Sequence, residues 1–331
     1  MNDSFTSRAD GYVQWLREQI GHQLVYLVYT TMLVFDDAGR ILVQRRYDFD
    51  WLGLPGGALE RYENLRTCAT RETFEETGLI VDVQRLVGVF SHPQYNLHYP
   101  NGDDVQQWSV ALIARPVGGT LRPDGGETLS VQWMEVDAAL PQFPPAYRAM
   151  IDAARQSPHA ATLEPVYAED TLTEHWHVLR PHVGHDTVIL PGAMAVIPNE
   201  RGEILAVRRT DNSLWTLPGG YADIGETTTN TIVREVREET GLAVEPVNAI
   251  GVYSDMPMML ALMPNNDIAH NIGIAFECRV TGGELHADGV ETSDIAYMSP
   301  DDFLAQSFLP TNDSPVVVRD YLRRETWPVL R

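Results

Sequence analysis

The chain has 331 residues, enough for about two ordinary domains of 100 to 200 residues each. Its 24 basic and 46 acidic residues give a net charge of -22, which disfavours binding to a nucleic acid duplex because the protein repels polyanions. Every basic side chain is arginine, so chemistry that depends on a lysine is excluded.

The chain has no apolar run as long as a bilayer span, and its first residues, MNDSFTSRAD, lack the basic and apolar regions of a signal peptide. We therefore expect a cytoplasmic protein that does not contact a membrane. The 2 cysteines, Cys68 and Cys278, cannot build a disulfide framework or a four-thiolate zinc site, and we expect both to be reduced packing residues.

In chain order, the residue patterns predict a short helix, two strands, a glycine-rich loop, a second helix and two more strands, and then the same series again. The first series is predicted at 11–20, 25–35, 41–46, 64–76, 81–90 and 105–116. The second series is predicted at 174–182, 187–197, 203–208, 227–239, 244–253 and 268–280. Strands interspersed with few helices favour mixed sheets whose faces are covered by helices.

The sequence itself repeats with the same period. LVQRR at 42–46 returns as LAVRR at 205–209, and LPGG at 54–57 returns at 217–220, an offset of 163 residues in both cases. After one loop the offset becomes 164, as PNGD at 100–103 and PNND at 264–267 show. Two copies with so long a period indicate the duplication of a whole domain. We predict a first domain at 1–150, a linker at 151–172 and a second domain at 173–331.

The second predicted helix of each copy carries a cluster of acids. Segment 57–79 begins GALERYE and ends RETFEETGL, and segment 220–242 begins GYADIGE and ends REVREETGL. On a helix, Glu72, Glu75 and Glu76 share one face, where like charges repel by a few tenths of a kcal/mol per pair. A hard divalent cation such as Mg²⁺ relieves this repulsion. An ordinary acidic surface helix is the alternative.

Other residues of the segment support a binding site. Arg71 stands four residues before Glu75 and can orient a carboxylate. Gly78 and Gly241 stand where a helix needs a left-handed stop. The upstream Gly56-Gly57 pair allows the backbone to approach a metal or a phosphate closely.

Both segments resemble the Nudix box, G-x5-E-x7-R-E-U-x-E-E-x-G-U, in which U is aliphatic. The second copy matches throughout, whereas the first has Thr73 at one aliphatic position, a change that concerns packing rather than chemistry. The resemblance implies two tandem Nudix-type α/β/α sandwiches with mixed β-sheets. It also implies a small nucleotide substrate and the hydrolysis of a nucleoside diphosphate linked to another group.

The resemblance further implies roles for individual residues, each with Mg²⁺ or Mn²⁺ as cofactor. The implied metal ligands are Gly56, Glu72, Glu75, Glu76, Gly219, Glu235, Glu238 and Glu239. The implied general base is Glu72 or Glu235, or else a later acid chosen from Glu127, Glu291 and Asp294. Arg71 and Arg234 are counted with the catalytic residues. The candidates for contacting substrate phosphate are Arg45, Arg46, Arg208, Arg209, Gly57 and Gly220, with strand-end salt bridges as the alternative for the arginines.

Five aromatic residues could stack on a nucleobase or simply belong to the core: Phe90, Tyr95, Tyr99, Tyr221 and Tyr253. Pro257 follows the second box by 15 residues, a spacing similar to that of ADP-ribose-hydrolysing Nudix proteins, and Pro93 follows the first by 14. We therefore expect a metal-dependent pyrophosphohydrolase, with ADP-ribose-like substrates favoured. The alternative is a nucleotide sensor in which one or both domains bind without turnover. We also expect the two domains to pack as an intramolecular pseudo-dimer.

Overall fold

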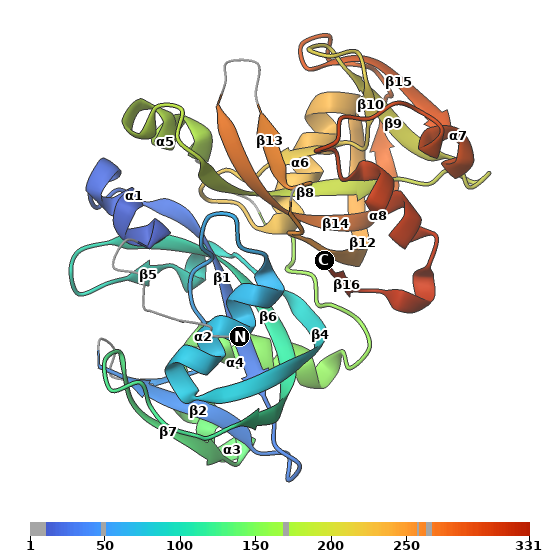
Figure 1. Ribbon diagram of the computed structural model, residues 1–331. Coiled ribbons are helices and arrows are strands. Elements are labelled where there is room, and N and C mark those ends of the chain that lie inside the picture. The colour runs from blue at the N-terminus through green and yellow to red at the C-terminus, as the bar shows by residue number, and fades with distance from the viewer. Residues whose placement is uncertain (1–10, 48–50, 168–171, 257, 263–266) are drawn as a thin grey trace.

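The computed structural model describes residues 11–47, 51–167, 172–256, 258–262 and 267–331, which form two successive α/β units (Figure 1). The first unit contains α1 (Tyr12–Ile20), β1 (Val25–Val34), β2 (Ile41–Arg46), β3 (Leu52–Gly53), α2 (Leu65–Thr77), β4 (Leu79–Phe90), β5 (Leu97–His98), β6 (Asp104–Gly119), β7 (Thr128–Met134), α3 (Val136–Ala139) and α4 (Pro145–Gln156). The second contains α5 (His175–Val183), β8 (Val188–Val196), β9 (Ile204–Arg209), β10 (Trp215–Thr216), β11 (Gly219–Tyr221), α6 (Thr228–Thr240), β12 (Leu242–Tyr253), β13 (Leu260–Leu262), β14 (Ile268–Gly283), β15 (Thr292–Met298), α7 (Pro300–Leu304), α8 (Ser314–Tyr321) and β16 (Val329–Leu330).

The helices and strands predicted from the sequence are all present, with ends that differ by a few residues. The predicted strand 41–46 is β2 with the same bounds, and the predicted helix 64–76 is α2, shifted by one residue. The later helices α3, α4, α7 and α8 were not predicted. Helices α3, α7 and α8 have only 4, 5 and 8 residues, and all four helices follow the segment in which the two copies resemble each other most.

Each unit holds a mixed sheet and an antiparallel one. In the first unit β1 runs parallel to β6, while β4 and β5 pair with β6 in the antiparallel direction. The smaller sheet has the order β3-β2-β7. The second unit repeats this plan, with β8 parallel to β14, β12 and β13 antiparallel to β14, and a small sheet of order β10-β9-β15. The predicted class, two tandem α/β/α sandwiches with mixed sheets, is confirmed.

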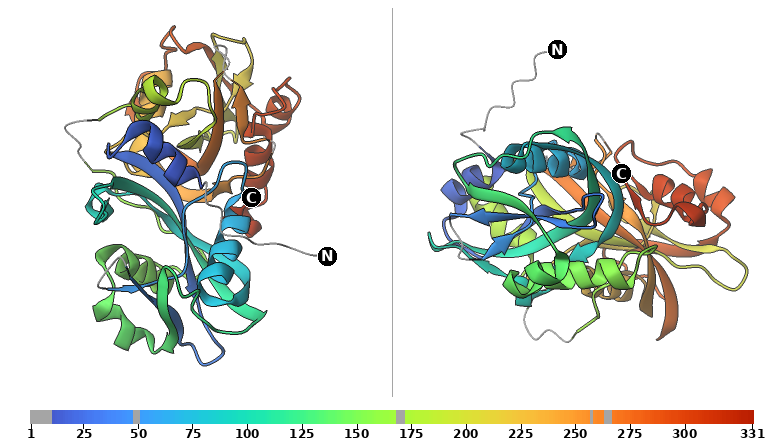
Figure 2. Two further views of the ribbon diagram at one scale, coloured as in Figure 1. Left: turned by 60° about the vertical axis from the view of Figure 1, so that its left-hand side comes forward. Right: turned by 90° about the horizontal axis from the view of Figure 1, so that it is seen from below.

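The two faces of the first mixed sheet bury alternate residues of its strands. Val110 and Leu112 of β6 belong to the core that includes Leu65 and Ala69 of α2. Ala111, between them, belongs to the separate core that includes Met150 of α4. Because neighbouring strand residues point to opposite faces, α2 and α4 cover opposite sides of the sheet. This layering carries the acidic helix α2 on one face (Figures 1 and 2).

The core beneath α2 continues into the second unit, where it takes in residues of α6, β8, β12 and β14. Hydrogen bonds cross this boundary in related pairs. The backbone N–H of Ile189 donates to the Tyr12 hydroxyl at 3.1 Å, and the N–H of Tyr26 donates to Nε2 of His175 at 3.2 Å. Since 12 and 175 differ by 163, as do 26 and 189, one contact repeats the other with the two units exchanged.

The predicted linker 151–172 begins inside α4, which continues as far as Gln156 and buries Ile151. Beyond that helix the chain contacts both units. The N–H of Tyr167 donates to Oδ1 of Asn230 at 3.3 Å, and the Tyr167 ring stacks on His92 with the centroids 4.4 Å apart. The first domain therefore extends past residue 150, because the apolar side of α4 packs on its sheet.

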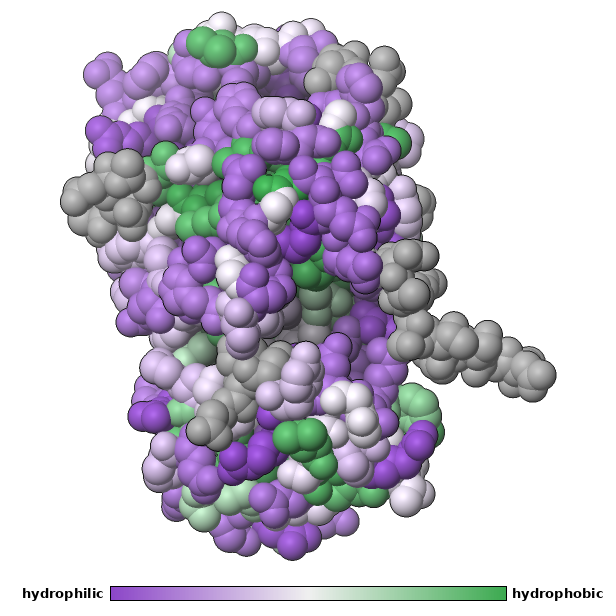
Figure 3. All heavy atoms as spheres, turned by 90° about the vertical axis from the view of Figure 1, so that its left-hand side faces the viewer, coloured by the Kyte–Doolittle hydropathy of each residue, from purple (hydrophilic) through white to green (hydrophobic). Residues whose placement is uncertain are grey.

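Three further expectations concern the surface and the thiols. Cys68 and Cys278 are buried and not joined in a disulfide, as predicted. Among the described residues, no helix combines the length and the apolar character that a membrane span requires. The face seen in Figure 3 is mostly hydrophilic, with apolar side chains in scattered patches, as expected for a chain of net charge -22.

Candidate functional site

Helix α2 begins and ends one residue later than the sequence predicts. The side chain of Asn64 accepts a hydrogen bond from the N–H of Thr67 at 2.8 Å and so caps the first turn. Gly78 ends the helix in the left-handed conformation with φ 72°, and its N–H donates to Phe74. Thr73, the departure from the box pattern, is buried and donates its hydroxyl to the carbonyl of Ala69 at 2.7 Å. The helix therefore satisfies this polar side chain internally.

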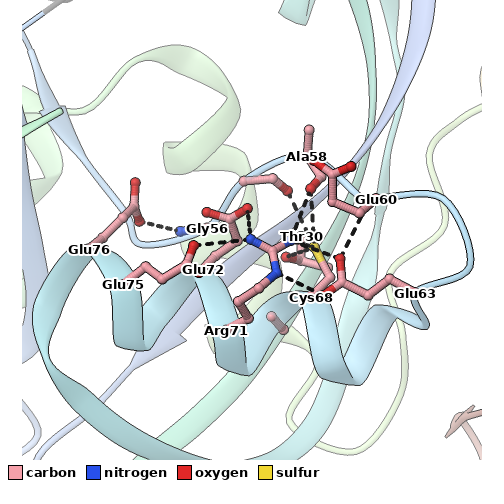
Figure 4. A network of polar contacts seen from close by, with 12 residues as sticks. Thr30, Gly56, Ala58, Glu60, Glu63, Cys68, Arg71, Glu72, Glu75 and Glu76 are labelled. Carbon is pink, nitrogen blue, oxygen red and sulfur yellow. Dashed lines mark hydrogen bonds and ion pairs between the residues drawn. The ribbon is translucent and has the colours of Figure 1, made fainter. Parts of the chain in front are cut away.

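Arg71 is the centre of the polar cluster on α2 (Figure 4). Its Nε and Nη2 donate to the two carboxylate oxygens of Glu63, each at 2.8 Å, in a two-point contact. Its Nη1 donates to Glu72 at 2.6 Å and to Glu75 at 3.2 Å. The predicted contact with Glu75 is present, but the stronger one is with Glu63, a box residue for which the sequence suggested no role.

Glu76 is held from the other side. One of its oxygens accepts the N–H of Gly56 at 2.9 Å, and the other accepts Nη1 of Arg46 at 3.1 Å. A Cβ on Gly56 would lie 2.0 Å from the carbonyl oxygen of Thr30, and one on Gly57 would lie 2.4 Å from the carboxyl carbon of Glu72. Both glycines are therefore required for close packing against Thr30 and Glu72, and their approach to a metal or a phosphate remains a prediction.

The carboxylates lie in surroundings poor in compensating charge. Burial raises the pKa of Glu72 to about 7 although Arg71 acts to lower it. Burial, together with the charge of Glu72, raises the pKa of Glu76 to about 8. In the second unit burial likewise raises the pKa of Glu235 to about 7 and of Glu239 to about 8. Both sites thus favour an added positive charge.

The oxygen donors fit a hard cation such as Mg²⁺, which prefers carboxylates. However, no group of three or more Asp, Glu, His or Cys side chains within the described residues is arranged to hold a metal ion. The reason is visible in Figure 4, where Glu72 and Glu75 turn toward Arg71 and Glu76 turns toward Gly56. The metal ligands named from the sequence therefore remain a prediction.

A cavity of about 350 Å³ opens beside this cluster in the first unit. Its wall includes Glu72 and the backbone of the glycine pair, together with Arg46 and Glu127. Four aromatic side chains are also part of the lining, namely Tyr29, Trp51, Tyr99 and Tyr147. Trp51 and Tyr147 meet edge to face with centroids 5.6 Å apart. Acidic and aromatic side chains thus line one cavity.

Of the five aromatic candidates, Tyr99 lines the cavity, whereas Phe90 and Tyr253 are buried in the core and Tyr95 packs near His92. The cavity residues Tyr29, Trp51 and Tyr147 were missed. Trp51 stands just before the LPGG entry and could have been noticed there. Tyr147 comes from α4, a helix that the sequence analysis did not predict, so no local signal identified it.

The arginines that precede the loop point in different directions. Arg46 bridges Glu76 and Glu127, with distances of 3.1 and 3.2 Å, while Arg45 is exposed on the neighbouring strand position. In the second unit Arg209 pairs with Asp211 at 2.9 Å, and Arg208 is exposed and donates to the carbonyl of Ser213. Substrate contact by any of the four remains a prediction, and the cavity favours Arg46.

The three acids that follow the box, considered as alternative general bases, have exposed side chains. The Glu127 side chain is 65% exposed, and both Glu291 and Asp294 are exposed. Glu291 is near enough for its charge to raise the pKa of Glu235 and Glu239. Asp294 faces Arg208 in the strand register and accepts the N–H of Ile295. Of these acids, Glu127 lines the cavity, where it forms an ion pair with Arg46.

The second unit repeats the acidic cluster closely. Arg234 donates to Glu226 at 2.7 Å, to Glu235 at 2.8 Å and to Glu238 at 3.1 Å. The N–H of Gly219 donates to Glu239 at 2.9 Å, and a Cβ on Gly220 would lie 2.4 Å from a carboxylate oxygen of Glu235. Both copies therefore hold their glutamates by similar contacts, except that Arg46 binds Glu76 whereas Arg209 pairs with Asp211.

The wall beside the cluster differs between the units. Gly192 stands at the position of Tyr29, and Tyr221 stands at the position of Ala58. Tyr221 lies parallel to Trp176, with an interplanar angle of 1° and centroids 6.3 Å apart, and the Arg180 guanidinium covers Trp176 at 3.9 Å. The two units thus combine one acidic cluster with two different aromatic surfaces.

The NUDIX domain family model matches residues 25–154 and again residues 189–319, which together are well over half of the chain. The chain belongs to the NUDIX family. Each match contains one acidic helix and one glycine pair, so the two units are two tandem NUDIX domains.

Individual relatives are similar to single units of the chain. A putative 8-oxo-dGTP diphosphatase of Bacillus subtilis is 38% identical over 109 residues, which are 33% of this chain and 66% of that protein. An ADP-ribose pyrophosphatase of Methanocaldococcus jannaschii is 32% identical over 143 residues, which are 42% of this chain and 75% of that protein. The crystal structure of an ADP-ribose pyrophosphatase from Streptococcus suis is 25% identical with a TM-score of 0.34, covering 43% of this chain and 96% of that one.

The chain spans 66% of the Bacillus relative and 62% of a MutT-like protein of Streptomyces ambofaciens, which is 34% identical. The names of the Bacillus subtilis and Methanocaldococcus jannaschii relatives describe a diphosphatase and a pyrophosphatase. Pro257, the residue that favoured ADP-ribose by its spacing, lies outside the described residues.

Proposed function

We propose that the chain is a divalent-metal-dependent pyrophosphohydrolase that cleaves a nucleoside diphosphate linked to another group, with ADP-ribose-like compounds favoured. The observation that carries this proposal is the mixed lining of one cavity in the first unit. Glu72 and the glycine pair lie in the lining of the same cavity as the four aromatic residues. A nucleoside diphosphate likewise has a charged diphosphate at one end and a flat aromatic base at the other.

The cavity suggests how such a substrate lies. Trp51, Tyr99 and Tyr147 offer ring faces and edges to the base or sugar. Arg46 and the backbone at Gly56 and Gly57 lie nearer the glutamates, where a diphosphate would be held. Mg²⁺ or Mn²⁺, when bound by Glu72, Glu75 and Glu76, would neutralise the phosphate oxygens and make attack by water easier.

A general base must reach the attacking water, and two acids of the cavity are candidates. Glu72 lies in the wall with its carboxylate fixed by Arg71 at 2.6 Å, whereas Glu127 lies at the rim with its side chain 65% exposed. We favour Glu72, because a fixed carboxylate inside the cavity keeps its position during the reaction. Glu235 has the same place in the second unit, next to Arg234.

The alternative function, nucleotide sensing without turnover, would not require the whole cluster. Both units keep the arginine, the three helix glutamates and the glycine pair in the same contacts. This agreement favours two catalytic sites. The different aromatic walls favour different substrate preferences for the two sites.

A nucleotide panel with Mg²⁺ tests the proposal on the full chain. The parent should release a nucleoside monophosphate from at least one compound. Glu75→Gln alone should remove the turnover of the first site, and Glu238→Gln alone should remove that of the second. A chain that gains thermal stability with nucleotides but releases no monophosphate would instead be a sensor.

We further propose that the two domains act as an intramolecular pseudo-dimer. The shared core and the paired hydrogen bonds of Tyr12 with Ile189 and His175 with Tyr26 support it. Small-angle X-ray scattering should give one compact particle. A profile of two beads without a fixed mutual orientation would contradict the pseudo-dimer and leave the proposed hydrolysis unaffected.

A further inference from the structure

A second cavity, of about 310 Å³, lies between the two domains and away from the acidic helices' carboxylates. One side is formed by β4 of the first domain, and the other by the last residues of the chain, which include β16 (Figure 1). Of the described residues that line it, three are arginines and none is acidic: Arg66, Val83, Gln84, Arg85, Leu86, Pro328, Val329, Leu330 and Arg331. In a chain of net charge -22, such a lining is unusual.

The three guanidinium groups differ in how their charge is compensated. Arg331 forms a two-point ion pair with Asp320, at 2.6 and 2.7 Å. Arg85 donates to the carbonyls of Ala154 at 2.9 Å and Leu86 at 3.3 Å, which are neutral partners, and burial lowers the pKa of its guanidinium. Arg66 is exposed in the first turn of α2. The crevice therefore keeps positive charge on Arg66 and Arg85.

The duplicated domain provides an internal comparison. Gly88 of β4 forms a parallel bridge with Thr162 of the linker, and Gly251, 163 residues later, pairs in parallel with Val329. Residues 161–164 of the linker are thus the counterpart of residues 328–331. By this correspondence, the residues that match the lining of the crevice come from β12, the start of α6 and the linker.

At these matching positions none of the three arginines is present. Thr229 stands in place of Arg66, Asn248 in place of Arg85, and Glu164 in place of Arg331. The Thr229 hydroxyl donates to the Glu164 carbonyl at 2.9 Å, and the Asn248 amide donates to Glu277 at 2.8 Å. The matching positions therefore carry no arginine, so the duplicated fold does not by itself explain why three arginines line the crevice.

We propose that this crevice, lined by Arg66, Arg85 and Arg331, is a binding site for a phosphate group, carried by inorganic phosphate or by a phosphomonoester. A guanidinium presents paired donors that match phosphate oxygens, and Arg66 and Arg85 supply two such groups from one domain. Arg331, held in position by Asp320, faces them from the other domain. A bound phosphate would then link the two domains. This site is separate from the proposed hydrolytic sites and does not depend on them.

Isothermal titration calorimetry in EDTA tests the proposal, because the metal-free carboxylate clusters repel phosphate. Inorganic phosphate is titrated into the full chain at constant ionic strength set with chloride, and AMP is titrated in a parallel arm. We expect one phosphate per chain and a rise in thermal midpoint. The variant Arg66→Thr/Arg85→Asn introduces the residues of the other domain, and we expect it to weaken binding at least tenfold.

The control Arg201→Thr/Arg279→Asn removes two exposed arginines of the second domain and changes the net charge equally. It should bind phosphate as the parent does. Arg66→Thr alone, a change at an exposed position, should also weaken binding if the double variant is unstable. Tighter binding of AMP than of phosphate, lost in the Arg66→Thr/Arg85→Asn variant, would identify a phosphomonoester as the ligand. A parent that shows no saturable binding, or binding that survives in the double variant, would overturn the proposal.

Discussion

Ser91 and Ser254 occupy equivalent positions, and the hydroxyl of each accepts a hydrogen bond from the first turn of the acidic helix in the opposite domain. Ser254 accepts the N–H of Leu65 at the start of α2, and Ser91 accepts the N–H of Thr228 at the start of α6, both at 3.0 Å. Both serines are buried. Each helix that carries the glutamates is therefore capped in part by the other domain.

Ser254→Ala should destabilise the chain by about 1 to 3 kcal/mol, since the buried N–H of Leu65 would lose its partner. Ser91→Ala should cost a similar amount. The free energy of unfolding in urea measures both, with Ser130→Ala on an exposed strand position as the control. Unchanged unfolding in both buried variants would show that the two caps contribute nothing.

Glu75→Gln together with Glu238→Gln should abolish turnover while the fold survives. The exchange removes one negative charge from each cluster but keeps the side-chain size, and Glu75 is partly exposed. Release of monophosphate and circular dichroism measure the two expectations. The matched control Glu18→Gln changes an exposed glutamate of α1. Equal product release by the double variant and the parent would reject the assigned clusters.

Mg²⁺ affinity should rise with pH and level off above about pH 8. Burial raises the pKa of Glu72 to about 7 and of Glu76 to about 8, so below these values the cation must displace protons from the site. Affinity should change by up to about tenfold per pH unit for each proton displaced. Titration of Mg²⁺ between pH 6 and 9 measures this, and Glu76→Gln should give a shallower dependence. Constant affinity across that range would contradict the expectation.

His270 should make the stability of the chain depend on pH. Its Nδ1 accepts the N–H of Tyr62 from the other domain at 3.3 Å, and burial lowers its pKa from 6.5 to about 4. Between pH 6.5 and 4 the imidazole of His270 therefore binds a proton in the unfolded chain but not in the folded chain. The free energy of unfolding falls as the pH falls from 6.5 toward 4.

Gln106 holds the equivalent place in the first domain, where it accepts the N–H of Gly225 at 2.8 Å. His270→Gln therefore keeps an acceptor and removes the titration. In this range the pH slope of the unfolding free energy should fall by up to about 1.4 kcal/mol per pH unit. Urea unfolding at pH 4.5, 5.5 and 6.5 compares the two proteins. Parallel curves would exclude His270 as the titrating group.

The sequence was most informative where residues that act together are also close along the chain. Arg71 and Glu75 are four residues apart, so the helical period alone placed them side by side. Trp51 and Tyr147 meet in one cavity although 96 residues separate them, and that meeting depends on how α4 packs on the sheet. The partners of Ser254 and His270 lie in the other domain. The sequence repeat predicted that a second domain exists, but not how the two domains pack against each other.

Tyr29 and Ala58 of the first domain correspond to Gly192 and Tyr221 of the second, so a large ring has changed sides between two neighbouring strand positions. In an assembly of two identical copies, any such exchange would alter both pockets at once. Because the halves here are encoded separately within one polypeptide, selection can reshape one pocket while the other keeps its original ligand.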